Sequence, residues 1–397
     1  MLHSMNYYLD LTLLKNTFLF WLVLCHFALT TTAQIRLGAE DTASYLSELK
    51  GKKIGVVAHQ ASLIFSSGNQ KHLVDFLLEH TIKIKGVFAP EHGFRGVADA
   101  GEKIEDGKDP LTQLSIYSLY GKNRKPSPDQ LEGIELMIFD LQDVGVRFFT
   151  YLSTLHYVLE ACAEQNIPVI LLDRPNPNSH YVDGPVLNLE NSSFVGMHPV
   201  PIVYGMTIGE YAKMINGEGW LSNGVSCNLK VIPIQNYTHQ TPYRLPVRPS
   251  PNLPNAQAVA LYPSLCLLEP TEISIGRGTD KQFQLYGHPL FPRQQFSFIP
   301  EPNFGSKSPK HNGTLCYGVD LTQIEKPNKL EIKWLIDAYS IFPKKSTFFL
   351  KGFDRISGDR NLKTQIEQQI PESEIRKTWK QDLEKFKKIR AKYLIYP

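Results

Sequence analysis

Acidic side chains stand directly after three short apolar segments of this chain, where they could carry out acid–base chemistry. The acids in these positions are Glu91, Asp140, Asp143 and Asp173. A carboxyl group in a partly apolar pocket can stay protonated and act as a general acid, and Pro90 and Phe94 give Glu91 such surroundings. A second carboxylate would then activate water or stabilise an oxocarbenium ion. The pattern predicts metal-free acid–base hydrolysis, with Glu91, Asp140 and Asp143 as catalytic candidates.

Cations accompany these acids in each of the three turns. They are Arg95, Arg147 and Arg174. In one turn taken alone, a helix cap or a local ion pair explains such charges equally well. Three such turns at one rim of a sheet favour a functional cleft, because ionisable groups that cluster in a cleft mark active sites.

Other classes of chemistry lack their sequence signatures. Dinucleotide binding needs a G-x-G-x-x-G turn after the first strand, but residues 58–62 read AHQAS. A P-loop and a G-x-S-x-G nucleophile elbow are also absent, so we expect no cofactor. A metal-dependent hydrolase that uses His59, His92, Asp140 and Asp173 stays an alternative, although no H-E-x-x-H spacing supports it and we expect no metal.

Alternating strand and helix patterns would hold the three turns in place. Short apolar runs predict strands, and apolar residues at helical spacing predict the helices between them. The expected strands span residues 54–58, 82–89, 134–139, 169–172 and 229–234, and the expected helices span residues 73–79, 150–165 and 207–215. This order predicts an α/β fold with a parallel sheet covered on both faces, whose strand ends meet at one ligand-binding rim.

The second half of the chain has a different composition. Residues 241–256 are rich in proline and predict an extended linker or a binding loop. The elements expected beyond it are strands at residues 271–275 and 347–350 and helices at residues 330–340 and 372–392. We therefore expect a catalytic domain at residues 34–240 and a smaller α+β domain at residues 241–397 that completes the cleft.

The first 33 residues are expected to be a signal peptide outside the fold. Residues 17–29 form an apolar run after Lys15, and Thr31, Thr32 and Ala33 form a small-residue cleavage site. A membrane anchor is the alternative, but the run is shorter than the ~20 residues that a span needs. We expect cleavage near Ala33 and a periplasmic protein with no stable membrane insertion.

Composition limits the possible partners. The 397 residues include 42 Lys and Arg against 39 Asp and Glu, a net charge of +3. So small an excess gives no reason to expect nucleic acid as a partner. The cysteines that follow the expected signal can be free or paired, and the sequence decides neither that question nor the oligomeric state. They are Cys162, Cys227, Cys266 and Cys316.

Longer strings around the three turns resemble one known family. They include FAPEHGFRG at residues 88–96, DAGE at 99–102, FDLQDVGVRFFTYLSTL at 139–155, DRPNP at 173–177, GPVL at 184–187, SFVGMHPVPIVYGMTIGE at 193–210 and LYPSLCLLEPTEISIGRGTDKQF at 261–283. From about residue 35 to its end, the chain is similar to the NamZ-like exo-β-N-acetylmuramidases. The resemblance implies an exported hydrolase with a Rossmann-like N-terminal domain. It also implies release of N-acetylmuramic acid from the non-reducing end of peptidoglycan fragments during cell-wall turnover.

The resemblance also implies which residues bind the substrate. They are His92, Arg95, Gln142, Arg147, Tyr151, Asp173, Arg174, Asn176 and Arg277. The lactyl carboxylate of muramic acid requires a bidentate arginine, for which Arg95, Arg147, Arg174 and Arg277 are the candidates.

The sequence departs from the family pattern at three places and leaves some questions open. Phe149 replaces a tyrosine, Tyr204 replaces a histidine, and residues 268–272 read LEPTE. These departures leave the acids and arginines of the three turns in place. A carbohydrate-binding protein without catalysis stays the alternative from another class. The choice between retention and inversion depends on the separation of the two carboxyl groups.

Overall fold

The computed structural model describes residues 34–66, 69–95, 106–293 and 295–397, and the chain from Arg36 to Pro397 forms one compact unit. The expected signal at residues 1–33 and the DAGE string at residues 99–102 lie outside the described residues. Among the helices of the described ranges, none is long and apolar enough to cross a membrane.

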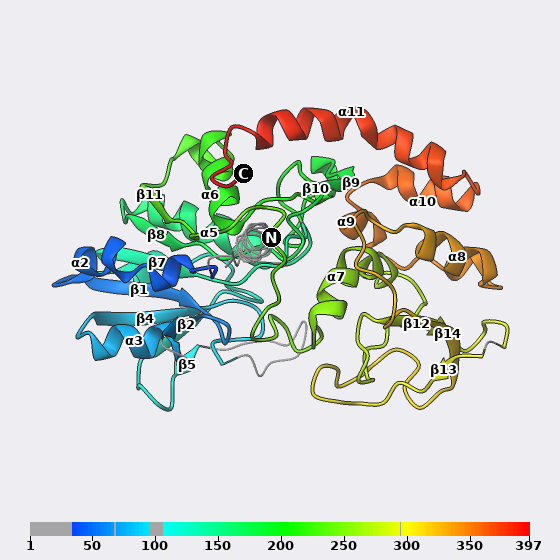
Figure 1. The fold of residues 1–397 in the computed structure, drawn as a ribbon, viewed down its shortest axis with the longest axis horizontal. Helices are drawn as coiled ribbons and strands as arrows, with labels where there is room; N and C mark the ends of the chain where they lie inside the picture. Colours follow the sequence, from blue (N-terminus) through cyan, green and yellow to red (C-terminus); the bar gives the residue numbers. More distant parts are fainter. Residues whose placement is uncertain (1–33, 67–68, 96–105, 294) are drawn as a thin grey trace, which may run out of the picture. The chain divides into compact units, whose positions relative to one another are not determined.

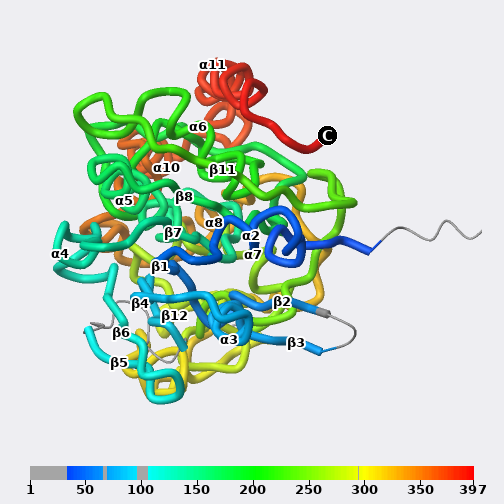
Figure 2. The backbone as a smooth tube through the Cα atoms, turned by 90° about the vertical axis from the view of Figure 1, so that its left-hand side faces the viewer, coloured from blue at the N-terminus to red at the C-terminus, as the bar shows by residue number. Residues whose placement is uncertain are grey.

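A seven-stranded sheet forms the centre of the first half of the chain (Figures 1 and 2). Its strands, in spatial order, are β11 (Leu229–Ile232), β8 (Val169–Leu172), β7 (Leu136–Asp140), β1 (Lys53–Ala58), β4 (Lys83–Ala89), β6 (Ser115–Ser118) and β5 (Gly107–Lys108). All neighbours pair in parallel except β5, which is antiparallel to β6. The five strands expected in this half are present, and the predicted α/β class is confirmed.

Helices cover both faces of this sheet, because its strands alternate between two buried faces. Val57 and Phe139 face the core formed with α5 (Tyr151–Glu164) and α6 (Ile208–Gly217). Their neighbours Val56 and Ile138 face the opposite core. The helices on that side are α2 (Leu46–Leu49) and α3 (Leu73–Glu79). With both faces covered, the carboxyl ends of the strands are left as the place for a site.

A capping box formed by Thr207 and Glu210 fixes the start of α6. The Thr207 hydroxyl accepts a hydrogen bond from the Glu210 amide at 3.2 Å, and the Glu210 carboxylate accepts one from the Thr207 amide at 2.9 Å. This satisfies amide groups that the first turn of a helix otherwise leaves unpaired.

Shorter elements lie between the strands and helices of the first half. They are the hairpin β2 (Leu63–Ser66) and β3 (Asn69–His72), helix α4 (Pro128–Leu131), and the antiparallel pair β9 (Asp183–Val186) and β10 (Pro201–Val203). The second half contains α7 (Ala256–Leu265), strands β12 (Leu285–His288), β13 (Ser297–Phe298) and β14 (Cys316–Asp320), and helices α8 (Lys333–Ile341), α9 (Phe353–Ser357), α10 (Arg360–Glu367) and α11 (Glu372–Arg390). The last three strands form a small antiparallel sheet in the order β12-β14-β13.

Two strands expected in the second half are wrong. Residues 271–275 and 347–350 make only single bridges, Thr271 with Phe349 and Ser274 with Gly287. The first segment is cut short because Gly276 turns the chain with a φ of 80°, and the second follows a 3₁₀ turn. The helices expected at residues 330–340 and 372–392 are present as α8 and α11.

The C-terminal segment returns to the first half of the chain. Arg376 on α11 forms an ion pair with Asp183 on β9 at 2.9 Å. Tyr396, next to the last residue, donates a hydrogen bond to Asp173 at the end of β8, at 2.6 Å. The domain boundary near residue 240 stays a prediction, but the last helix contacts elements on both sides of it.

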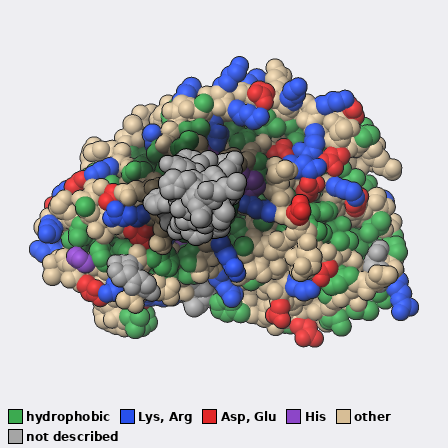
Figure 3. All heavy atoms as spheres, in the orientation of Figure 1, with side chains coloured by type: hydrophobic (Ala, Val, Ile, Leu, Met, Phe, Trp, Pro, Cys, Tyr) green, Lys and Arg blue, Asp and Glu red, His purple; other side chains and the backbone are tan. Residues whose placement is uncertain are grey.

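Charges of both signs are interspersed on the face drawn in Figure 3, outside the grey atoms. This agrees with the small net charge of +3. On that face, electrostatic recognition has to come from local groups of side chains rather than from one broad charged surface.

Candidate active site

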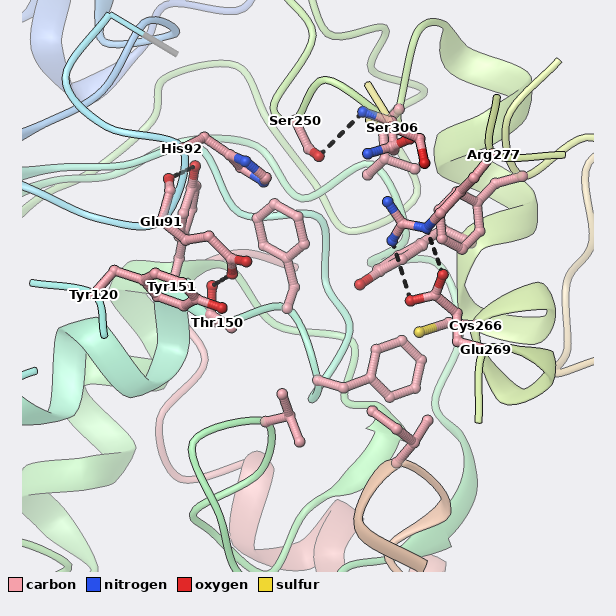
Figure 4. Close-up of a pocket in the computed structure, with 18 of the residues that line it drawn as sticks. Glu91, His92, Tyr120, Thr150, Tyr151, Ser250, Cys266, Glu269, Arg277 and Ser306 are labelled. Carbon is pink, nitrogen blue, oxygen red and sulfur yellow. Dashed lines mark hydrogen bonds and ion pairs between the residues drawn. The ribbon is translucent and has the colours of Figure 1, made fainter. Parts of the chain in front are cut away.

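A cavity of about 550 Å³ lies where the turn after β4 and the start of α5 meet loops of the second half (Figure 4). Glu91 and Glu269 are the only acids among the described residues that line it, and Figure 4 shows them on opposite walls. Phe148, Phe149 and Tyr262 add aromatic surface, with their rings packed edge to face. A cavity that combines aromatic rings with convergent polar groups is typical of a site for a small organic ligand.

The turn after β4 brings Glu91 to this cavity. β4 ends in buried residues at Ala89, and the chain then reverses, with the Gly93 amide donating to the Pro90 carbonyl at 3.0 Å. His92, also a cavity residue, has a φ of 72°, which is rare for any residue other than glycine. Strained backbone of this kind is concentrated at functional sites, where the surrounding structure holds it in place.

Two hydroxyl groups hold the Glu91 side chain. The Thr150 hydroxyl, next to the start of α5, donates a hydrogen bond to Glu91 Oε2 at 2.7 Å. The Tyr120 hydroxyl bonds the same carboxyl group, and burial together with this acid raises the pKa of Tyr120 well above its usual value. Tyr120 therefore stays protonated and can keep donating to Glu91.

A buried chain of hydrogen bonds fixes Tyr151 beside this turn. The Gln142 amide donates to His59 Nε2 at 3.0 Å, so the ring proton of a neutral His59 is on Nδ1, which faces the Tyr151 hydroxyl at 3.1 Å. Burial, and secondly Arg174, lowers the pKa of His59, which keeps the ring neutral. The Tyr151 hydroxyl in turn faces the carbonyls of Glu91 at 3.4 Å and Pro249 at 3.3 Å. Tyr151 thus lines the cavity and also supports the Glu91 backbone.

An acid–arginine pair forms the opposite wall. Arg277 donates to both carboxylate oxygens of Glu269, from Nε at 2.6 Å and from Nη2 at 3.1 Å. Burial opposes ionisation of Glu269, but the guanidinium outweighs it and lowers the pKa of Glu269 below its usual value. Nη1 of Arg277 makes no hydrogen bond to a described residue and is available to an anionic ligand.

Asp140 and Arg174 do not reach the cavity, because they are buried against each other. The two side chains form a bidentate pair, with Arg174 Nε and Nη2 at 2.5 and 2.8 Å from the Asp140 oxygens. Arg174 Nη2 also donates to the Leu63 carbonyl at 3.0 Å. The hypothesis that Asp140 is catalytic and Arg174 binds the substrate is not supported by these positions, since the pair joins β7, β8 and β2 below the site.

Asp143 and Gln142 are likewise used within the turn after β7. Asp143 accepts hydrogen bonds from the Gly145 amide at 2.7 Å and from the Tyr204 hydroxyl. Burial raises the pKa of Asp143 to about 6. Gln142 Nε2 donates to the carbonyls of Asp143 and Pro175, each at 2.8 Å. Neither side chain lines the cavity, so the predicted catalytic role of Asp143 has no geometric support.

Asp173 and Asn176 support backbone in the turn after β8. Asp173 accepts hydrogen bonds from the hydroxyls of Thr207 at 2.7 Å and Tyr396 at 2.6 Å. Asn176 Nδ2 donates to the Met206 carbonyl at 2.8 Å. Both side chains are buried away from the cavity, which argues against the substrate contacts expected of them.

Two of the four candidate arginines are also occupied elsewhere. Arg147 is 2% exposed and donates to backbone carbonyls from β9 to α9, and burial lowers its pKa to about 9. Those carbonyls belong to Pro185, Val200, Ile356 and Ser357. Arg95 forms a bidentate pair with Asp109, at 3.2 and 2.7 Å. Of the four arginines proposed for the lactyl carboxylate, only Arg277 lines the cavity.

Several cavity residues were not predicted as site residues. Glu269 lies in the LEPTE string that the sequence marks as a departure, eight residues before its partner Arg277. Tyr120, Ser250 and Asn252 come from loops without any recognisable motif. For the metal alternative, the described part of the chain holds no group of three or more His, Cys, Asp or Glu side chains that could bind a metal ion.

Comparisons with known proteins cover nearly the whole chain. Residues 54–257 match the family model described as exo-beta-N-acetylmuramidase NamZ, N-terminal, and residues 260–396 match its C-terminal counterpart. The peptidoglycan beta-N-acetylmuramidase NamZ of Bacillus subtilis (strain 168) is 37% identical over 374 residues, 89% of each chain.

Two crystal structures of DUF1343 family proteins from Bacteroides fragilis have the same fold. One is 42% identical, with a TM-score of 0.84, and the match covers 92% of this chain and 99% of the other. The second is 27% identical, with a TM-score of 0.78 and coverage of 91% and 99%.

Proposed function

The chain belongs to the exo-beta-N-acetylmuramidase NamZ family, and from this premise we propose how its cavity acts on peptidoglycan. The protein is a glycosidase that removes N-acetylmuramic acid from the non-reducing end of peptidoglycan fragments. The observation that carries the assignment of residues is the placement of Glu91 and Glu269 on opposite walls of one cavity. Paired carboxyl groups across a scissile bond are the usual equipment of a glycosidase.

The two acids have different neighbours and can therefore have different roles. Glu269 is held ionised by Arg277, which suits an acid that stabilises the positive charge of an oxocarbenium-like transition state. The hydroxyls of Thr150 and Tyr120 orient the carboxyl group of Glu91, which serves as the general acid that protonates the leaving oxygen. Different environments for two acids commonly mark such a division of work.

Arg277 recognises the group that distinguishes muramic acid from other amino sugars. Its Nη1 donors have no hydrogen-bond partner among the described residues and can bind the lactyl carboxylate, while Glu269 fixes the plane of the guanidinium. Phe148, Phe149 and Tyr262 offer ring surface to the sugar.

Export to the periplasm is part of the same proposal. The apolar run at residues 17–29 and the small residues before Gln34 support it, because a signal of this kind would bring the enzyme to its cell-wall substrate. N-terminal sequencing of the exported protein should begin near Gln34, whereas a start at Met1 or Met5 would contradict cleavage.

The activity is tested with a purified peptidoglycan tetrasaccharide whose non-reducing end is N-acetylmuramic acid. Mass spectrometry should detect free N-acetylmuramic acid and a trisaccharide, with no disaccharide as a first product. A carbohydrate-binding protein would raise the melting temperature on adding the tetrasaccharide and release nothing. Activity that EDTA abolishes and a divalent ion restores would indicate the metal-dependent alternative.

A further inference from the structure

Two further cavities lie beside the candidate active site along the proline-rich segment. One, of about 620 Å³, shares Leu253 with the site cavity, and the other, of about 280 Å³, shares Arg244 and Leu245 with the first. Residues 242–245 line the smaller cavity and residues 244–249 line the larger one, and we call the two cavities together the proline-rich groove. The groove therefore starts beside the site in which the terminal sugar is removed.

The proline-rich groove is basic. Its described lining includes Arg244, Arg248 and Lys326 but no Asp or Glu. Both arginines are exposed, and neither has an ion-pair partner among the described residues. Lys326 donates to the Pro177 carbonyl at 2.7 Å and stays partly exposed to the groove. Three cations in a described lining that includes no acid are complementary to an anionic ligand.

The backbone of residues 242–249 presents these arginines on one side. Exposed and more buried residues alternate there. The exposed ones are Pro242, Arg244, Pro246 and Arg248, and the more buried ones are Tyr243, Leu245, Val247 and Pro249. Period-two alternation is typical of extended backbone, and proline stiffens such a segment. A stiff segment loses little conformational entropy when it binds a ligand.

An exposed aromatic ring connects Arg248 to the wall of the site cavity. The guanidinium of Arg248 lies 5.9 Å from the ring centre of Phe304, which is 57% exposed. Ser306, two residues further along, lines the site cavity. An exposed ring beside a cation offers a sugar ring a surface on which to pack, close to a partner for its carboxylate.

We propose that the proline-rich groove binds the part of the glycan strand that remains after the terminal sugar is removed. Arg244 and Arg248 pair with the free lactyl carboxylate of the next muramic acid in the strand. The proposal rests on the proposed function, because an exo-acting enzyme holds the terminal sugar in its cavity and the rest of the strand must leave past the cavity wall. Muramic acid occupies alternate positions of the strand, so carboxylates recur along it.

The test compares two substrates with free lactyl carboxylates, the disaccharide MurNAc-GlcNAc and the tetrasaccharide MurNAc-GlcNAc-MurNAc-GlcNAc. The wild-type enzyme should have a lower KM for the tetrasaccharide. The double variant R244A/R248A should raise that KM about twofold to 30-fold, which corresponds to about 0.4–2 kcal/mol for the loss of two exposed ion pairs. It should leave the disaccharide KM and both kcat values unchanged. High salt should remove the wild-type preference for the tetrasaccharide.

Two further variants make the comparison specific. Arg293→Ala removes an exposed arginine that lines none of the three cavities, and it should change neither KM. Phe304→Ala should raise the KM for the tetrasaccharide more than the KM for the disaccharide. Equal effects of R244A/R248A on both substrates, or no effect on either, would overturn the proposal.

A peptide-bearing tetrasaccharide separates the two sources of carboxylates in peptidoglycan. In it the lactyl carboxylates are amidated by stem peptides, which carry acids of their own. If R244A/R248A raises the KM only for this substrate, the groove binds the stem peptide and the proposal is overturned. Should the wild type release no sugar from the disaccharide, the proposed function fails instead. Calorimetric binding of the two oligosaccharides would then still decide whether the groove binds the strand.

Discussion

Glu91 and Glu269 have identical side chains but different hydrogen-bond partners in the cavity. Hydroxyls of Thr150 and Tyr120 reach Glu91, and the Arg277 guanidinium reaches Glu269. One acid is thereby placed for proton donation and the other for charge stabilisation. Arg277 has a second task, because its Nη1, which bonds none of the described residues, is the donor available to the lactyl carboxylate.

The variant Arg277→Lys tests that second task. A lysine cannot reproduce the planar fork, and hydrogen bonds to charged groups contribute about 1.5–3 kcal/mol, so kcat/KM for an N-acetylmuramic acid glycoside should fall roughly 10-fold to 150-fold. The activity on the matching N-acetylglucosamine glycoside, which has no lactyl group, is expected to be lower in the wild type and should change little in the variant. Steady-state kinetics on both glycosides measures the difference.

Arg95→Lys is the matched control, because Arg95 also forms a bidentate pair with an acid but lies outside the cavity. It should leave kcat/KM for both glycosides near the wild-type values. If Arg277→Lys lowers activity on the two glycosides equally, Arg277 supports the site without recognising the lactyl group.

At the residue scale, the sequence correctly predicted that the turn with Glu91 lines the cavity. It also predicted site residues in the neighbouring turns that do not line it. Glu91, His92, Tyr151 and Arg277 line the cavity as predicted, whereas Asp140, Arg174 and Arg147 are buried in contacts with the protein itself. Sequence spacing places a side chain at the rim of the sheet. It does not determine whether the side chain points into the cleft or back into the fold.

The turns after β7 and β8 are packed against each other so closely that they act as one element. Gly145 has a φ of 79°, and a Cβ atom built there would lie 2.1 Å from Asn176 Oδ1. Asn176 is fixed in turn by its bond to the Met206 carbonyl. This contact explains physically why the two motifs occur together in the chain.

The variant Gly145→Ala should therefore be strongly destabilised. The left-handed backbone costs about 1–2 kcal/mol for a residue with a Cβ atom, and overpacking against Asn176 adds typically 1–3 kcal/mol. Urea unfolding of the two proteins would measure the loss. Gly219→Ala, at a similar φ of 65° with open space around it, isolates the backbone part. An equal loss in both variants would show that the packing against Asn176 contributes nothing.

The parallel strands and their covering helices were predictable because their patterns are local. Apolar runs of four to seven residues and the Thr207–Glu210 capping box can be recognised from the few residues that form them. The segments at residues 271–275 and 347–350 have strand-like composition but make only single bridges, and nothing local shows that the pairing does not continue. The curled loops that supply Tyr120 and Asn252 to the cavity depend on long-range packing.

Over the whole molecule, Asp173 joins the sheet, helix α6 and the C-terminal segment. It accepts bonds from the Gly209 amide at 2.8 Å and from the hydroxyls of Thr207 and Tyr396. Burial raises the pKa of Asp173 to about 7 in spite of these donors. Sequence patterns do not reveal this contact, because 223 residues separate Asp173 from Tyr396.

The free energy of unfolding should depend on pH through this acid. An unfolded aspartate titrates near pH 4, so between about pH 4 and 7 the unfolded chain loses a proton that folded Asp173 keeps. The stability that protonated Asp173 contributes is present below pH 4 and is lost as the pH rises through about 7. Relative to Asp173→Asn, the wild-type protein should become progressively less stable over this range in urea unfolding.

Asp109→Asn is the matched comparison for the pH experiment. Burial opposes ionisation of Asp109, but Arg95 and Thr112 outweigh it and lower its pKa, so its contribution is lost only at lower pH. Its difference from the wild type should stay constant between pH 5 and 8. A constant difference for Asp173→Asn as well would contradict the titration of Asp173 near neutrality.

The central claim is that Glu91 donates the proton to the departing sugar, and turnover of Glu91→Gln on two substrates tests it most directly. On the natural disaccharide, kcat should fall about 10²–10⁴-fold, the usual contribution of general acid–base catalysis. On an activated aryl glycoside, whose departure needs little protonation, it should fall much less, with substrate binding retained. Glu367→Gln, an exposed acid on α10, should change neither rate. Near-normal turnover of the disaccharide by Glu91→Gln would contradict the account.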